Sequence, residues 1–141
     1  FTNKNPFILT YAGAHGLANN LDNIVEAAKI LKNHPVLFLF IGDGVEKKGL
    51  KEKSKNLKNI KFLDPIAKID IPDFLIKSDA ILFSLRNIKL FEYGISPNKL
   101  YDAYAIGRPV ITTVDGVINK EVEENLLGFT AAASNPKDLA N

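Results

Sequence analysis

The sequence contains no cysteine, no methionine and no tryptophan, and it has only two histidines among 141 residues. Without cysteine, disulfide bonds and thiolate chemistry are excluded, which is typical of proteins from a reducing compartment. The two histidines, His15 and His34, lie far apart, and neither has a carboxylate-rich cluster near it in the sequence. We therefore expect no structural or catalytic metal, because ions such as zinc need several such ligands together.

A strong charge imbalance and long apolar runs are missing as well. Eighteen lysines and arginines against sixteen acidic residues leave a net charge of +2, which is too small to indicate a nucleic-acid partner. No apolar run reaches the roughly 18 residues of a membrane-spanning helix, and no charged-then-apolar leader opens the sequence. We expect neither a transmembrane segment nor a signal peptide. Because the chain opens on Phe1 directly before a predicted strand, we also expect it to be a piece of a larger protein.

The composition, with 46% hydrophobic and 24% charged residues, is that of an ordinary globular protein, and the length suits one domain. Six short apolar runs alternate with segments of helical periodicity. Such strands indicate a parallel sheet covered on both faces. We predict an α/β domain with a Rossmann-like open parallel sheet of about six strands and helices on both faces. The predicted strands are Pro6 to Tyr11, Val36 to Ile41, Asn59 to Leu63, Asp79 to Leu85, Pro109 to Thr113 and Gly128 to Ala133.

The predicted helices fall between these strands, and the stretch with Arg86, Lys89 and Glu92 is predicted to be a loop. The helical segments are Leu21 to Leu31, Val45 to Leu57, Ile71 to Lys77, Gly94 to Pro109, a turn at Glu121 to Asn125, and a helix that starts at Asn135-Pro136.

The segment Gly94 to Pro109, GISPNKLYDAYAIGRP, has both helix ends marked. Ser96 is a suitable N-cap, and Gly107 supplies the stop. A helix N-terminus offers unpaired N–H groups and about half a positive charge, which attracts anions. Lys99 adds a cation in the first turn, where stability alone would favour an acidic residue. We interpret this helix start as an anion site, with an ordinary capped surface helix and a solvated Lys99 as the alternative.

Ligands of open parallel sheets bind at the carboxyl ends of the strands, where this chain has two glycine loops, 13–16 (GAHG) and 42–44 (GDG). Such glycines let the backbone approach phosphate closely, although a tight strand-to-helix turn also needs glycine. We expect the His15 side chain to face this rim rather than the core and to donate a hydrogen bond to a phosphate or sugar hydroxyl. Lys47, just beyond the second loop, would reach an anion at the same rim.

Ser96, Lys99 and Asp102 form the strongest group of candidate site residues. The backbone amides and the cation suit a diphosphate, while a carboxylate about one turn inside the helix suits the two hydroxyls of a ribose. The group therefore fits a nucleoside diphosphate.

Three segments in this order and spacing, YAGAHGLANNLDNIVEAA, FLFIGDGVEK and GISPNKLYDAYAIGRPVI, resemble the C-terminal donor-binding domain of retaining GT-B glycosyltransferases of family four. The branch that looks most similar is that of bacterial polysaccharide and O-antigen enzymes, and the resemblance covers essentially the whole chain. It implies metal-independent transfer, with retention, of a hexosyl group from a UDP- or GDP-linked sugar. Residues 1–141 would be the donor-binding half, and an N-terminal acceptor domain would lie outside this chain.

The residue patterns and the resemblance together give a set of expected site residues. His15 and Lys99 would be catalytic, Asp102 would hold the ribose, and the loop around Pro65 would edge the base. The other expected donor-binding residues are Gly13, Ala14, Gly16, Gly44, Lys47, Ser96, Asn98 and Leu100.

The chain departs from the family pattern at three positions. A second glutamate of the family falls on Gly94, and an arginine and a lysine fall on Ala14 and Asn19. Neutralisation of the phosphates would therefore come from Lys99, Arg86 or Lys47.

For the full enzyme, the resemblance implies surface polysaccharide biosynthesis on a glycan or polyprenyl-linked acceptor, in the cytoplasm, with peripheral association at the inner face of the membrane. We expect this chain alone to bind nucleotide weakly and to turn over nothing. Two alternatives remain: half of a GT-B sugar-nucleotide epimerase, and a non-catalytic nucleotide-binding or protein-interaction domain of flavodoxin-like architecture.

Overall fold

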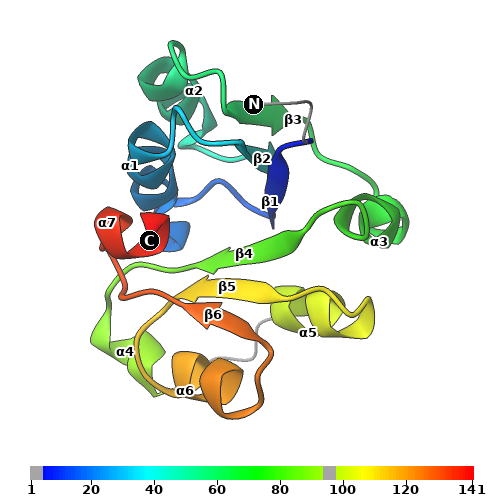
Figure 1. Ribbon diagram of the computed structural model, residues 1–141, viewed down its shortest axis with the longest axis vertical. Coiled ribbons are helices and arrows are strands. Elements are labelled where there is room, and N and C mark those ends of the chain that lie inside the picture. Colours follow the sequence, from blue (N-terminus) through cyan, green and yellow to red (C-terminus); the bar gives the residue numbers. More distant parts are fainter. Residues whose placement is uncertain (1–4, 94–97) are drawn as a thin grey trace.

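The fold is described from a computed structural model that covers residues 5–93 and 98–141. Its centre is one parallel sheet of six strands in the order β3-β2-β1-β4-β5-β6, which Figure 1 shows from β3 at the top to β6 at the bottom. All six predicted strands are confirmed. Their bounds are β1 Phe7–Ala12, β2 Val36–Ile41, β3 Ile60–Leu63, β4 Ala80–Ser84, β5 Val110–Thr113 and β6 Gly128–Thr130.

The helices lie between the strands, as expected. Two predictions were wrong in extent: the turn predicted at 121–125 is part of a longer helix, and the loop predicted after β4 contains a short helix. Short 3-10 turns also precede α1 and α3, at Leu17–Asn19 and Lys68–Asp70. The helices are α1 Leu21–Ile30, α2 Lys47–Ser54, α3 Ile71–Leu75, α4 Lys89–Glu92, α5 Asn98–Ala105, α6 Val117–Glu124 and α7 Pro136–Ala140.

The apolar strands bury side chains on both faces of the sheet. On one face, alternate residues of β1 and β2 such as Leu9 and Phe38 pack against Ile24 and other residues of α1. On the other face, residues of β4 and β5 such as Phe83 and Val110 pack against α3, α5 and α6. Helix α7 lies beside α1, as Figure 1 also shows. Because both faces are covered, the strands need apolar residues at nearly every position.

The order of the strands reverses at β1, which pairs with β2 on one side and with β4 on the other. Ligands of open α/β sheets bind beside the carboxyl ends of the strands at such a switch point. In flavodoxin-like sheets the switch lies between the first and third strands, so the strand order disagrees with the flavodoxin-like alternative.

The end of α5 follows the sequence prediction. Gly107 adopts a positive φ of 67°, its amide donates to the Tyr104 carbonyl, and the Arg108 amide donates to the Ala103 carbonyl. This is the pattern of a glycine-terminated helix. The predicted cap, Ser96, lies outside the described residues.

No helix within residues 5–93 and 98–141 is long and apolar enough to cross a membrane. In the same residues, no three histidine, aspartate or glutamate side chains lie close enough together to hold a metal ion.

Candidate functional site

A groove runs along the carboxyl ends of the strands at the switch point. It consists of two adjoining hollows of about 300 and 240 Å³ that share Gly13, Ile66 and Ile71. We call it the rim groove. Its remaining lining residues are Ala12, Ala14, Ile41, Gly42, Asp43, Pro65, Lys68, Pro72 and Asp102. The ends of β1, β2 and β3 and the start of α3 therefore meet the side of α5 here.

The two glycine loops that wall the groove lie against each other. The Gly13 amide donates to the Ile41 carbonyl at 2.9 Å, and the His15 amide donates to the Asp43 carbonyl at 2.8 Å. Gly42 has a φ of 138°, and a Cβ there would overlap the Gly13 carbonyl oxygen. Only glycine permits this approach. The loops are thus fixed to each other by main-chain contacts.

The first glycine loop also offers unpaired main-chain donors. Among the described residues, none accepts a hydrogen bond from the amide of Ala14 or Gly16. The Ala14 carbonyl is held from two sides, by the Tyr11 hydroxyl at 2.7 Å and the Asn19 side-chain amide at 3.0 Å. A loop held in this way can present its free amides to an anion.

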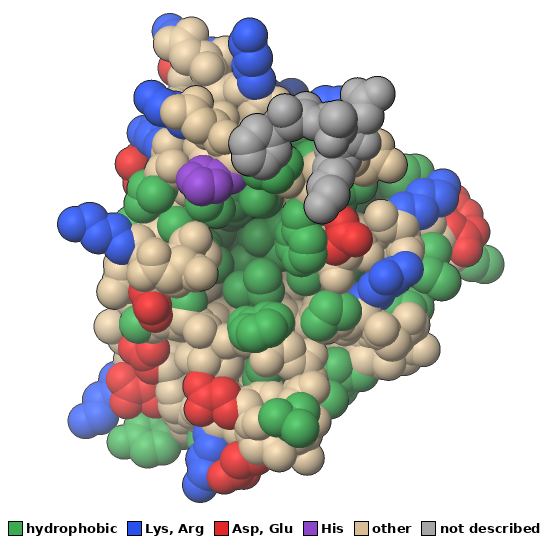
Figure 2. Space-filling model, in the orientation of Figure 1, with side chains coloured by type: hydrophobic (Ala, Val, Ile, Leu, Met, Phe, Trp, Pro, Cys, Tyr) green, Lys and Arg blue, Asp and Glu red, His purple; other side chains and the backbone are tan. Residues whose placement is uncertain are grey.

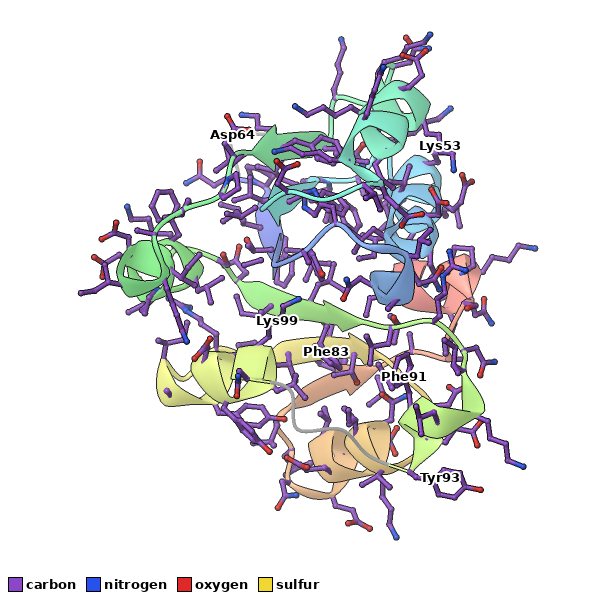
Figure 3. All side chains as sticks on the ribbon, turned by 180° about the vertical axis from the view of Figure 1, so that it is seen from behind. Lys53, Asp64, Phe83, Phe91, Tyr93 and Lys99 are labelled. Atoms are coloured by element: carbon purple, nitrogen blue, oxygen red, sulfur yellow. The ribbon has the colours of Figure 1, made fainter. Side chains whose placement is uncertain are left out.

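Lys99 brings a cation to this loop. Its side chain reaches from α5 toward the central strands (Figure 3), and a Cβ on Gly13 would overlap its ammonium group. The ammonium donates to the Tyr11 hydroxyl at 3.1 Å and lies 4.7 Å from the centre of the Tyr11 ring. Burial lowers the pKa of Lys99. No described carboxylate pairs with it, so this half-buried cation lacks an anionic partner.

Asp102 lies three residues after Lys99 on the same helix and lines the groove beside Gly13, Ile66 and Ile71. Its side chain is exposed. The carboxylate is therefore available to accept hydrogen bonds from a ligand in the groove, while the ammonium of Lys99 can donate to the same ligand.

The prediction that the His15 side chain faces the rim was wrong. His15 is fully buried, and its ring centre lies 6.1 Å from those of Tyr11, Phe40 and Phe62. Neither ring nitrogen has a partner among the described residues. Burial, with a contribution from the charge of Lys47, lowers the pKa of His15 from 6.5 to about 4. A position at a loop tip did not determine the side-chain direction, because the three aromatic rings offer an apolar pocket beneath the loop.

The prediction that Lys47 reaches an anion was also wrong. Its ammonium donates to the Gly42 carbonyl at 2.7 Å, the Leu63 carbonyl at 3.2 Å and Asp64 at 2.9 Å. An ammonium has three N–H donors, and all three are used within the protein.

The remaining predicted site residues lie in different surroundings. The Leu100 side chain is buried in the core, so only its main chain is free for a ligand contact, while Asn98 is exposed in the first turn of α5. Arg86 donates to the Leu17 carbonyl next to Gly16. A Cβ on Gly44 would overlap the His15 main chain, which makes Gly44 a packing position between the two loops. Pro65 lines the groove as expected.

A family model described as glycosyl transferases group 1 matches residues 6–141. This chain belongs to the group 1 glycosyltransferase family. The strand order and the helices on both faces correspond to a GT-B glycosyltransferase domain. A solved structure with this fold is that of the Anabaena Alr3699/HepE protein, crystallised with UDP and glucose, which matches with a TM-score of 0.78. The two proteins are 22% identical, and the match covers 97% of this chain and 37% of the HepE chain.

Two curated proteins are similar to this glycosyltransferase domain. The probable glycosyltransferase WbjE of Pseudomonas aeruginosa is 26% identical over 97% of this chain and 35% of its own length. The putative colanic acid biosynthesis glycosyl transferase WcaI of Escherichia coli K12 is 26% identical over 79% of this chain and 27% of its own length. The glycosyltransferase domain thus spans about a third of the curated relatives that it matches.

The sequence interpretation missed Tyr11 and Ile71 of this glycosyltransferase domain. Tyr11 holds both the Ala14 carbonyl and Lys99, and Ile71 lines both parts of the rim groove. The available signal was position: Tyr11 comes two residues before the glycine loop, and Ile71 opens a helix after the third strand.

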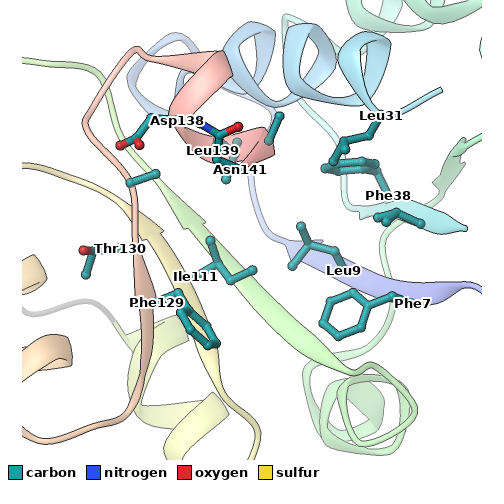
Figure 4. A pocket seen from close by; sticks show the side chains of 13 residues that line it. Phe7, Leu9, Leu31, Phe38, Ile111, Phe129, Thr130, Asp138, Leu139 and Asn141 are labelled. Atoms are coloured by element: carbon teal, nitrogen blue, oxygen red, sulfur yellow. The ribbon is translucent and has the colours of Figure 1, made fainter. Parts of the chain in front are cut away.

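A second and larger hollow of the glycosyltransferase domain, of about 410 Å³, lies over the first residues of β1 and β2 and beside β6 and α7. Figure 2 shows it as a concave surface of hydrophobic side chains, and Figure 4 shows Phe7, Ile111 and Phe129 around it, with Leu139 of α7 above. We call it the apolar hollow. None of the described residues in its lining is a lysine or arginine, so these residues offer no cation to a phosphate group.

Proposed function

We propose that this domain binds a nucleoside-diphosphate sugar in the rim groove and that the full-length protein transfers the sugar to an acceptor. The diphosphate lies against Gly13 and the free amides of the first glycine loop, next to Lys99. Asp102 accepts hydrogen bonds from the ribose hydroxyls. The loop with Pro65 and Ile66 contacts the base of the nucleotide.

The observation that carries this proposal is the environment of Lys99. A half-buried ammonium without a carboxylate partner among the described residues is unfavourable by itself, because burial removes water from the charge. It lies over Gly13, at the switch point where α/β sheets bind ligands. An anion in the groove would restore a partner for the charge, and a diphosphate supplies two negative groups of suitable size.

The same arrangement suits the chemistry of glycosyl transfer. When the bond between the anomeric carbon of the sugar and the β-phosphate oxygen breaks, negative charge develops on the leaving nucleoside diphosphate. Lys99 and the loop amides are fixed before the reaction, and pre-positioned donors of this kind stabilise such charge effectively. Lys99 is thus the catalytic residue that we propose, without a metal ion. His15 has no part in it, since its side chain is buried away from the groove.

The finer properties of the full-length protein belong to the proposal as well. We infer retention at the anomeric carbon, an acceptor-binding domain in the remaining part of the protein, and a glycan or lipid-linked acceptor in surface polysaccharide synthesis. The relatives support this role: the WcaI protein is described as acting in colanic acid biosynthesis. Since the HepE structure contains UDP, UDP is the first nucleotide to test.

The proposal is tested by titrating UDP, GDP and ADP into the 141-residue chain and measuring the dissociation constant by calorimetry. We expect weak but specific binding of one nucleotide and no sugar transfer by this chain alone. Lys99→Ala should weaken binding at least about tenfold, because the diphosphate loses its cation. Asp102→Ala should weaken binding about tenfold through loss of the ribose hydrogen bonds.

The matched controls are Lys32→Ala, which removes an exposed charge after α1, and Glu121→Ala, which removes an exposed charge on α6. They should leave the affinity within about twofold of that of the unchanged chain. If no nucleoside diphosphate binds, or if Lys99→Ala binds as tightly as the controls, the proposal is wrong.

A further inference from the structure

Lys47 is a buried cation in a helix of otherwise exposed lysines. Its side chain is only 9% exposed, and it shares one face of α2 with the buried residues Leu50 and Ser54. Burying an ammonium group is unfavourable unless hydrogen-bond acceptors replace water. Lys47 has three such acceptors: the carbonyls of Gly42 and Leu63 and the carboxylate of Asp64.

These acceptors lie where two strands of the sheet separate. Gly42 follows the last residue of β2, and Leu63 is the last residue of β3. The Gly42 amide still donates to the Leu63 carbonyl, at a longer distance of 3.3 Å. Lys47 therefore bridges the ends of β2 and β3 at the point where their ladder stops. Its ion pair with Asp64 adds little, since that carboxylate is 91% exposed and exposed pairs are weak.

The loop after β3 depends on this bridge. Among the described residues, no main-chain hydrogen bond ties residue 65 or 66 to the rest of the protein. Yet Pro65 and Ile66 form a wall of the rim groove. Lys47 attaches this wall to the rest of the protein through its hydrogen bonds to the Leu63 carbonyl and to the Asp64 carboxylate.

We propose that Lys47 is a positioning residue, which holds the loop 64–66 in the place where it contacts the base of the nucleotide. The inference rests on the proposed function, because the base contact belongs to that function. Lys47 itself does not touch the ligand. It sets the width of the groove between Gly42 and Pro65, and with it the discrimination between bases.

The test compares Lys47→Met, which keeps most of the side-chain length but no donor, with Lys48→Met on the exposed side of the same helix. The first measurement is amide hydrogen exchange in the nucleotide-free chain. We expect the Gly42 amide, which donates to the Leu63 carbonyl, to exchange at least about tenfold faster in Lys47→Met, with α1 and β1 unchanged. Lys48→Met should exchange like the unchanged chain.

The second measurement is the affinity for UDP, GDP and ADP at a temperature where both variants are folded. Lys47→Met should weaken binding of the preferred nucleotide about tenfold and bring the three affinities closer together. A purely structural role would lower the melting temperature but would leave the ratio of the affinities unchanged, and this result would overturn the inference.

The two measurements separate the two proposals. Unchanged exchange at the Gly42 amide overturns the role of Lys47, whether or not nucleotide binds. Faster exchange there, in a chain that binds no nucleoside diphosphate, establishes that Lys47 positions the loop but overturns its role in base discrimination together with the proposed function.

Discussion

The rim groove and the apolar hollow both involve β1 and β2 but differ in what surrounds them. The rim groove lies at the carboxyl ends of the strands, where two glycine loops, apolar side chains such as Ile66 and the exposed carboxylate of Asp102 line it, and the half-buried cation of Lys99 lies against Gly13. The apolar hollow, although larger at about 410 Å³, is bounded mainly by apolar side chains of the strands, α1 and α7. The charged groups beside the glycine loops, rather than the size of the hollow, are what suit the rim groove to a diphosphate.

The shapes of the apolar hollow and the rim groove also depend on different interactions. At the hollow, side chains such as Leu9 and Phe38 contribute to the hydrophobic core, whose stability follows the apolar area that it buries. At the groove, shape depends on the close approach of Gly13 to Gly42 and on hydrogen bonds to the main chain. We therefore expect substitutions at the hollow to change stability but not binding, whereas those at the groove have local effects.

The largest effect is expected at the apolar hollow. Phe38→Ala removes a side chain that is only 1% exposed, and it should lower the free energy of unfolding by about 3 kcal/mol, because a cavity replaces buried contacts. Urea unfolding followed by circular dichroism measures this, since the chain has no tryptophan. Phe129→Ala is the control: this ring is 73% exposed, and its loss should cost no more than about 0.5 kcal/mol. Equal losses of unfolding free energy in the two variants would contradict the assignment of Phe38 to the hydrophobic core.

An intermediate effect is expected at the groove. Gly42→Ala places a methyl group against the Gly13 carbonyl oxygen at a positive φ, which should lower the free energy of unfolding by about 2 kcal/mol. Gly49→Ala is the matched control, because a Cβ there meets no atom within 4 Å and α2 gains a better helix former. It should raise the stability by about 0.5 kcal/mol. A neutral Gly42→Ala would show that the two loops are not in close contact.

The smallest effect concerns His15 beneath the groove. Its pKa is about 4 in the folded chain against an ordinary 6.5, so between these values the unfolded state binds more protons and the fold loses stability as the pH falls. We expect a loss of at least about 1 kcal/mol from this group across that window, since one pKa unit corresponds to about 1.4 kcal/mol. Unfolding curves at several pH values measure this.

The control for this prediction is His15→Phe, which keeps an aromatic ring in the cluster but cannot take up a proton. Its stability should fall less between pH 6.5 and about 4 than that of the unchanged chain. Parallel pH profiles for the two proteins would show that His15 does not carry the effect.

The strands and the end of α5 could be predicted from the sequence because each has a local cause. Apolar runs such as 36–41 suit only a strand buried on both faces, and Gly107 permits the positive φ that ends the helix. Helix α4 could not be predicted in this way: its four residues, Lys89–Glu92, are too few to show a helical period.

The side-chain directions of His15 and Lys47 were mispredicted for a different reason. Each depends on residues that are distant in sequence: Phe62 for His15, and Leu63 for Lys47. A partial signal existed for Lys47, because it lies three residues before Leu50 and seven before Ser54, and so on the buried face of α2. Lys99 lies near Gly13 because β1 pairs with β4. No local sequence pattern predicts this pairing.

The join between β1 and β4 is narrow: Leu9 and Thr10 pair with Ala80 and Ile81, whereas β1 pairs with β2 along its whole length. Residues 7–63 thus form one half of the sheet, and the strands from β4 onward form the other. Lys99 extends from the second half to Gly13 in the first, so a molecule held by both fastens the two halves across their narrowest strand pairing. Such a molecule favours only the fully assembled chain and would delay separation of the halves.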